Sequence, residues 1–259
     1  MSKSLPALFV GHGNPMNAIG NNAYTAAWRQ IGESLPKPKA ILSISAHWYV
    51  PFTGITVNDA PRTIHDFGGF PKELYQVQYP APGNPALGRR IQELLGPTEV
   101  KLDESWGLDH GTWSVLCHIY PDADIPVIQL SIDETKAATV HHEIGKKLSA
   151  LRDEGVLIFG SGNLVHNLHT YAWGRHMLEP YDWASRFESR AKELILSNKY
   201  EPLAHYETLG PDAELAVPTP EHYLPLLYVL GARRKEDAIT FPVHGVDGGS
   251  ISMLALQIG

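Results

Sequence analysis

Three histidines stand at or just beyond the ends of apolar runs that are typical of buried strands. His12 follows "LFVG", His47 follows "ILSISA", and His166 lies three residues after Asn163 in "GVLIFGSGNLVH". The carboxyl ends of parallel strands meet at one edge of an α/β sheet, where ligands bind. Imidazole binds Zn, Fe, Cu or Ni, and it also serves as an acid or base near neutral pH. The pattern predicts a convergent metal or acid–base site, although hydrogen-bonded structural histidines remain an equal alternative.

The residues around these histidines support a pocket. Gly11 and Gly13 flank His12, and both would let the backbone turn sharply and approach a ligand. His110 in "WGLDHGTW" and His222 in "TPEHYLPLLYVLG" lie in aromatic, glycine-rich or apolar surroundings that resemble pocket lining. No local spacing proves a metal site, so the ligand set stays open at this point.

Common local motifs are absent. "HHEIG" lacks the second histidine of H-E-x-x-H, and His141 and His142 are expected on the surface of a charged helix. "GHGNPM" departs from G-x-G-x-x-G because Met16 stands at the third glycine. Ser161 in "FGSGN" is a weak match to a nucleophile elbow, since G-x-S-x-G would need glycine at positions 159 and 163.

The strands and helices predicted around these residues indicate an α/β fold. Short apolar runs predict strands at 7–12, 40–48, 125–132 and 155–163, with further strands in "GITV", "AITFPV" and "SISMLALQI". Apolar spacing of three and four residues predicts helices at 84–96, 134–155 and 180–198. No repeat or linker divides the chain. We expect a single α/β domain over residues 1–259, with a central, mostly parallel or mixed sheet flanked by helices.

Composition narrows the class of partner. The 259 residues carry a formal net charge of −7, and the short basic cluster "ARRK" is expected to be a solvated turn. Clustered cations needed for nucleic acid are missing, and no apolar run is long enough for a signal peptide or membrane span. The single cysteine, Cys117, excludes an intrachain disulfide and a Cys-rich zinc site. We expect a cytoplasmic protein with a small-molecule substrate, whose oligomeric state the sequence leaves open.

Seven segments in order resemble one enzyme family. They are "GHGNPM", "SISAHW", "TIHDFGGFP", "YPAPG", "WGLDHGTW", "SGNLVHNL" and "PTPEHYLPLLYVLGA". Together they resemble the 4,5-DOPA extradiol dioxygenase group of the class III, LigB-type extradiol ring-cleavage dioxygenases. The resemblance implies a mononuclear non-haem Fe(II) site that inserts O₂ into a catechol such as L-DOPA.

The resemblance also implies roles for individual residues. His12, His47 and His222 would bind the metal, with Glu221 as a less favoured alternative to His222. His166 would be the acid/base, or a fourth ligand if Zn(II) occupies the site in purified protein, and His110 would be a hydrogen-bond donor beside it.

The catechol is expected among residues of the "SAHW" and "TIHDFGGFP" segments. They are Trp48, His65, Asp66, Phe67 and Phe70, joined by Trp113 of "WGLDHGTW", with Asp66 meeting an amine and Arg62 a carboxylate of the substrate. The irregular segment 63–85 is a candidate lid, because long loops of this kind are often functional. Two alternatives stay open: a zinc-dependent hydrolase of a small amide or ester, and a non-catalytic metal-binding protein.

Overall fold

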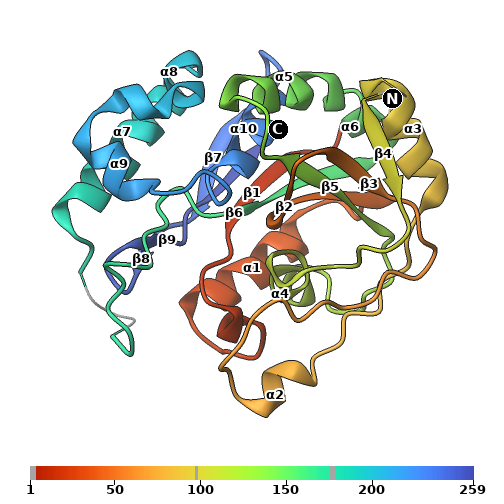
Figure 1. Cartoon of the computed structure of the whole chain (residues 1–259), viewed down its shortest axis with the longest axis horizontal. Coiled ribbons are helices and arrows are strands. Elements are labelled where there is room, and N and C mark those ends of the chain that lie inside the picture. The colour runs from red at the N-terminus through yellow and green to blue at the C-terminus, as the bar shows by residue number, and fades with distance from the viewer. Residues whose placement is uncertain (1–3, 97–98, 176–178) are drawn as a thin grey trace.

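The computed structural model describes residues 4–96, 99–175 and 179–259. Within these residues, eight strands form one mixed sheet in the order β4-β3-β5-β2-β6-β1-β10-β7 (Figure 1). These strands are β1 (Ala7–Gly11), β2 (Ala40–Val50), β3 (Thr53–Thr56), β4 (Val100–Asp103), β5 (Val127–Asp133), β6 (Val156–Gly162), β7 (Ile239–Val243) and β10 (Ala255–Ile258). A separate pair consists of β8 (Val246–Asp247) and β9 (Ile251–Ser252).

The centre of the sheet is parallel. β5, β2, β6 and β1 are parallel neighbours, whereas β3 joins β5, and β10 joins both β1 and β7, in antiparallel pairs. Successive side chains alternate between the two faces: in β1, Ala7 and Phe9 belong to one apolar cluster, and Leu8 and Val10 belong to the other. Both faces must therefore be covered, which explains why these strands are continuously apolar.

Helices cover both faces (Figure 1). One layer packs α10 and α5 over β6, β1 and β2, and the other places α4, backed by α1, on the opposite face. The helices are α1 (Ala23–Ser34), α2 (Lys72–Tyr75), α3 (Pro85–Leu95), α4 (His110–Ile119), α5 (Ala138–Leu148), α6 (Leu151–Glu154), α7 (Asp182–Leu196), α8 (Glu201–Ala204), α9 (Pro211–Ala216) and α10 (Leu224–Gly231), with 3-10 turns at Pro15–Ala18 and Tyr206–Leu209. The predicted α/β fold with a mixed central sheet is confirmed. Among the described residues, no helix has both the length and the apolar character to cross a membrane.

The prediction for His141 was wrong. We expected His141 and His142 on a charged surface, but His141 is fully buried and His142 is partly buried. α5 packs tightly against α10, and the His141 Nδ1 atom lies 2.8 Å from the Tyr228 hydroxyl. The charged residues of α5 lie on its other faces. The charged composition of this helix therefore gave no sign that His141 contacts Tyr228 in the interior.

This burial predicts a pH dependence of stability. Burial lowers the pKa of His141 to about 4, whereas the same residue in the unfolded chain has a pKa of about 6.5. Between these values the unfolded state binds a proton that the folded state does not. His141 should therefore lower the free energy of unfolding as pH falls from 6.5 toward 4, by at most about 3 kcal/mol.

Urea unfolding of wild type and His141→Gln between pH 4.5 and 7.5 measures this effect. The stability difference between the two proteins should shrink on the acid side, because the variant lacks the titrating group. His205→Gln, which changes an exposed histidine, is the matched control. Parallel curves for wild type and His141→Gln would contradict the prediction.

Candidate metal centre

His12 begins the loop after β1. Gly13 has a positive φ of 61°, and a Cβ atom on Gly11 would lie 2.5 Å from the Ser252 carbonyl oxygen. The two glycines thus permit the turn that the sequence suggested. The Ser161 hydroxyl donates to the Gly111 carbonyl at 2.5 Å, so its oxygen accepts from His12 Nδ1 at 3.0 Å. That contact places the His12 proton on Nδ1 and leaves Nε2 as a lone-pair donor.

His47 lies inside β2 and not after it. β2 pairs with β6 only as far as Ser45, and its register with β5 shifts between Ile44 and Tyr49. Such an irregularity re-aims a side chain. His47 Nδ1 lies 3.2 Å from Asp66 Oδ2, so a carboxylate faces this nitrogen, while Nε2 points to His12.

His222 reaches the same place from the turn before α10. Its carbonyl accepts a hydrogen bond from the Asn163 backbone N–H at 2.8 Å, which ties the turn to the end of β6. Its Nδ1 lies 3.2 Å from Glu221 Oε1. Glu221, which we had weighed as a ligand in its place, therefore contacts the far nitrogen of the His222 ring.

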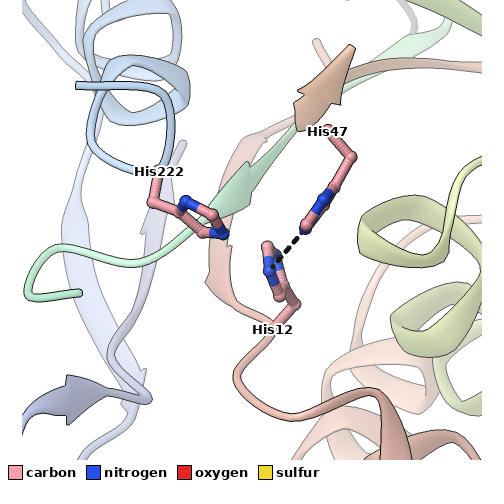
Figure 2. A group of neighbouring side chains, drawn as sticks. All are labelled: His12, His47 and His222. Atoms are coloured by element: carbon pink, nitrogen blue, oxygen red, sulfur yellow. Dashed lines mark hydrogen bonds between the residues drawn. The ribbon is translucent and has the colours of Figure 1, made fainter. Parts of the chain in front are cut away.

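The three rings converge (Figure 2). One ligand atom each from His12, His47 and His222 lie within 4.8 Å of one another, and the Nε2 atoms of His12 and His47 are 3.2 Å apart. Because the His12 proton is on Nδ1, its Nε2 lone pair faces His47 Nε2, which can donate a hydrogen bond to it; with both Nε2 atoms unprotonated, the pair can bind one cation. Metal–nitrogen bonds of about 2.1 Å would separate such atoms by about 3.0–3.4 Å. The residues present therefore fit a metal.

Burial keeps this cluster neutral, as metal ligation requires. It lowers the pKa of His47 to about 3 and lowers the pKa values of His12 and His222 well below their ordinary range. The neighbouring imidazoles act in the same direction, because each would repel a second positive charge.

His166 lies beside the three converging histidines. Its ring stacks on that of His222, with centroids 3.5 Å apart and planes 4° from parallel. The His166 backbone N–H donates to the Ala216 carbonyl at 2.8 Å, which fixes the residue after β6. Burial lowers its pKa to about 4, so the ring is a neutral proton acceptor at pH 7.

His110 is the first residue of α4, and its ring centroid is 3.8 Å from that of His47. Asp66 accepts from the His110 backbone N–H at 2.8 Å, and it lies 2.9 Å from His110 Nδ1. Burial alone would raise the pKa of Asp66, but the hydrogen bonds from His110 lower it overall. Asp66 therefore orients two histidines from behind.

A cavity of about 230 Å³ opens onto these rings. Its lining consists of His12, Gly13, Asn14, Pro15, His47, Phe70, His110, His166, Leu168, Tyr171, Trp173, His222, Asp247 and Ile251.

Several expected substrate contacts do not line this cavity. Trp48 is 2% exposed and stacks on Trp106, because neighbours on a strand point to opposite faces and His47 takes the inner one. His65 is tied to the Val77 carbonyl at 3.0 Å. Phe67 packs edge-on against His110, and Trp113 is fully buried. Neither Arg62 nor Asp66 reaches the lining formed by the described residues.

Sequence reasoning missed the residues that support and surround the site. Ser161 was considered only as a nucleophile, yet it fixes the His12 proton; a polar residue at the end of an apolar strand was the available signal. Tyr171, Trp173 and Asp247 carry no local motif. They come to the cavity through the segment after β6 and through β8, which only the fold brings together.

The segment 63–85 retains one feature of a lid. Phe70 lines the cavity, and it follows Gly68 and Gly69, around whose Cβ positions there is no atom within 4 Å. Changing both glycines to alanine should lower kcat about threefold to tenfold, corresponding to about 1 kcal/mol of altered loop free energy, and leave metal content unchanged. Steady-state kinetics with metal analysis measures both.

Gly210→Ala provides the control for this loop variant. Gly210 has a φ of 93°, comparable to the 79° of Gly69, and open space around it, but it lies outside the cavity lining. Equal effects on kcat in the two variants, or no effect in the loop variant, would refute the lid.

Known proteins resemble this chain along nearly its whole length. A family model for the catalytic LigB subunit of aromatic ring-opening dioxygenase matches residues 9–246. The 4,5-DOPA dioxygenase extradiol of Escherichia coli (strain K12) is 52% identical over 262 residues, covering 100% of this chain and 96% of its own. The protein of the same name from Beta vulgaris is 41% identical, covering 94% and 92%.

A solved structure agrees with these matches. The crystal structure of an uncharacterized protein from Escherichia coli K12 superposes with a TM-score of 0.86 at 49% identity, and covers 98% of this chain and 100% of its own. The sequence match spans the strands and turns that carry the converging histidines. The chain therefore belongs to the LigB family of aromatic ring-opening dioxygenases and is an extradiol ring-cleaving enzyme.

Proposed function

We propose that this enzyme opens a catechol such as L-DOPA by 4,5-extradiol cleavage, using Fe(II) bound by His12, His47 and His222. The observation that carries the proposal is the convergence of their ligand atoms within 4.8 Å while each Nδ1 meets an oxygen. Relatives at 52% and 41% identity bear the name 4,5-DOPA dioxygenase extradiol, which supports the choice of substrate.

Bound iron would supply the one-electron chemistry with O₂ and the attraction that holds both catechol oxygens. The remaining work belongs to the protein. Oxygen acceptors at the Nδ1 atoms hold the three rings in one tautomer and orientation. The cavity holds the ring on its apolar wall, including Phe70, and excludes water.

His166 is the proton carrier of this proposal. As a neutral ring lining the cavity, its free nitrogen can accept a proton from a catechol hydroxyl and return it when the ring opens. Stacking on His222 keeps it beside the ligand set. His110, held through Nδ1 by Asp66, directs its other nitrogen toward the cavity and hydrogen-bonds the bound oxygens.

Zinc is the alternative metal, because three imidazoles bind Zn(II) well and Zn(II) exceeds Fe(II) in general affinity. Zinc in the purified protein would thus report affinity and not catalysis. The match to a family of ring-opening dioxygenases removes the reason to propose that this protein is a zinc hydrolase.

Metal analysis combined with oxygen uptake tests the proposal. Apoprotein is loaded anaerobically with Fe(II) or Zn(II) and then supplied with L-DOPA and O₂. We expect uptake of one O₂ per L-DOPA and a yellow ring-fission product with iron only. Turnover with zinc, or none with a full complement of iron, would overturn the assignment of metal or substrate.

A further inference from the structure

Two large apolar side chains that line the cavity are also exposed to solvent. Leu168 is 50% exposed and Trp173 is 65% exposed, so they lie where the cavity opens. All six tryptophans of the chain are described, and Trp173 is the only one in the exposed class. A single exposed apolar side chain is ordinary, but two on the opening of one cavity indicate a surface that binds something apolar. We call these two residues the rim.

The backbone beside each rim residue is anchored. The Asn167 side chain, 5% exposed, donates from Nδ2 to the Leu215 carbonyl at 2.8 Å. The Ala172 backbone N–H donates to the Gly248 carbonyl at 3.0 Å. Each anchor directly precedes one rim residue, so hydrogen bonds to other parts of the chain hold the apolar surface in place at the opening.

The cavity runs from the histidines to the rim. At its inner end His12 is 2% exposed and His222 is 8% exposed, in contrast to the rim. In the proposed function, on which this inference rests, the two catechol oxygens lie at the histidines. The 4-position of the ring is on the side away from these oxygens, and it carries the arm of L-DOPA. A substituent at this position therefore points outward and passes the rim.

We propose that Leu168 and Trp173 determine substrate preference by binding the first carbons of the 4-substituent. Catechols with a longer apolar arm are then better substrates than 4-methylcatechol. Because the rim is open to solvent, the far end of an arm stays in water, so a charged end group such as that of L-DOPA is tolerated.

The size of this preference follows from the area that the rim covers. Complete burial of one methylene group strengthens binding about fourfold. A rim that covers one side of the arm should give about half of that free energy, or about twofold for each methylene. From 4-methylcatechol to 4-butylcatechol, kcat/KM should rise about fivefold to tenfold. The contact is far from the reacting atoms, so the change should appear in KM and leave kcat nearly constant.

Oxygen uptake by the Fe(II)-loaded enzyme with 4-methyl-, 4-ethyl-, 4-propyl- and 4-butylcatechol tests the proposal. The ratio of kcat/KM for the butyl and methyl compounds is compared within each protein. Trp173→Ala and Leu168→Ala should each lower this ratio to about half of the wild-type value or less. Leu196→Ala is the matched control, because Leu196 is 58% exposed at the end of α7 but lies outside the lining, and it should keep the wild-type ratio.

The exposure of Trp173 provides a second readout that needs no turnover. Acrylamide quenching of tryptophan fluorescence is measured on Fe(II)-loaded enzyme without O₂, with 4-butylphenol or 4-methylphenol as the probe. The Trp173 contribution is the difference between wild type and Trp173→Phe. 4-Butylphenol should protect Trp173 from quenching, and 4-methylphenol should protect it less. Wild type alone should show the same order of protection if the alanine variants do not fold.

The outcomes separate two failures. Uptake with 4-methylcatechol, but a rise of less than about twofold across the wild-type series, overturns the role of the rim and leaves the proposed function standing. The same conclusion follows if both alanine variants keep the wild-type ratio, or if 4-butylphenol leaves Trp173 as open to acrylamide as before. Absence of uptake with all four catechols on iron-replete protein overturns the proposed function, and this proposal with it.

Discussion

Replacing His166 by glutamine in the Fe(II)-loaded enzyme is expected to leave the iron content near that of wild type and to lower kcat by about 10²–10⁴. Glutamine keeps a polar side chain at this position but cannot exchange a proton near neutral pH. His166 stacks on His222 and shares a second group of close ligand atoms with Glu221 and His222, but it is not part of the converging group of His12, His47 and His222. Iron analysis and single-turnover kinetics on the same sample separate binding from chemistry.

Two variants bracket this result. His47→Gln should lose iron and activity together, and His142→Gln, at a partly buried histidine outside the cavity lining, should change neither. Four histidines around zinc in a crystal would not contradict the proton role, because tetrahedral zinc favours a fourth ligand. Loss of iron from the His166 variant would contradict it and make His166 a ligand.

Arg152→Met is expected to lower the free energy of unfolding by about 3–5 kcal/mol. The Arg152 guanidinium, 1% exposed, donates to the Leu5 carbonyl at 2.6 Å, to the Ala232 carbonyl at 2.9 Å and to both oxygens of Asp237. Removing it leaves the Asp237 carboxylate, 9% exposed, without its charged partner and two carbonyls without a donor. Urea unfolding at pH 7 measures the loss.

An exposed ion pair of similar geometry is the control. Arg186 makes a bidentate contact with Asp212 at 2.8 Å, but its side chain is 62% exposed. Arg186→Met should therefore cost less than about 1 kcal/mol. If both substitutions lower the free energy of unfolding equally, the burial of the Arg152–Asp237 ion pair does not explain its contribution to stability.

The fold was predictable where one physical signal dominated. Continuous apolar runs located β1, β2, β5 and β6 to within about two residues, because strands covered on both faces tolerate few polar side chains. α10 was not predicted: it is apolar on all sides, so it shows no helical period. We expected one helix over 134–155 because the apolar residues keep one amphipathic pattern throughout this range. The structure instead has two helices there, α5 and α6.

The site was predictable in part. His12 and His166 could be located from strand ends alone, since topology brings the ends of parallel strands together. His222 precedes a helix, and no spacing rule links it to His12; its surroundings suggested pocket lining, but only the family resemblance suggested a metal ligand. Trp48 and Asp66 lie outside the cavity lining for one shared reason: a motif gives the order of residues, whereas the side-chain direction depends on the local backbone.

The order of synthesis gives the placement of β1 a further consequence. β1 lies between β6 and β10, with Ala7 opposite Ile158 and Ile258, so β1 is synthesised about 150 residues before its first partner. Until then its apolar edge is open to wrong pairing, which makes a nascent chain a natural client for chaperones. His222 is also made long after His12 and His47, so the metal site proposed for these three residues cannot form while β1 and β2 are being synthesised, and a metal bound there cannot guide early folding.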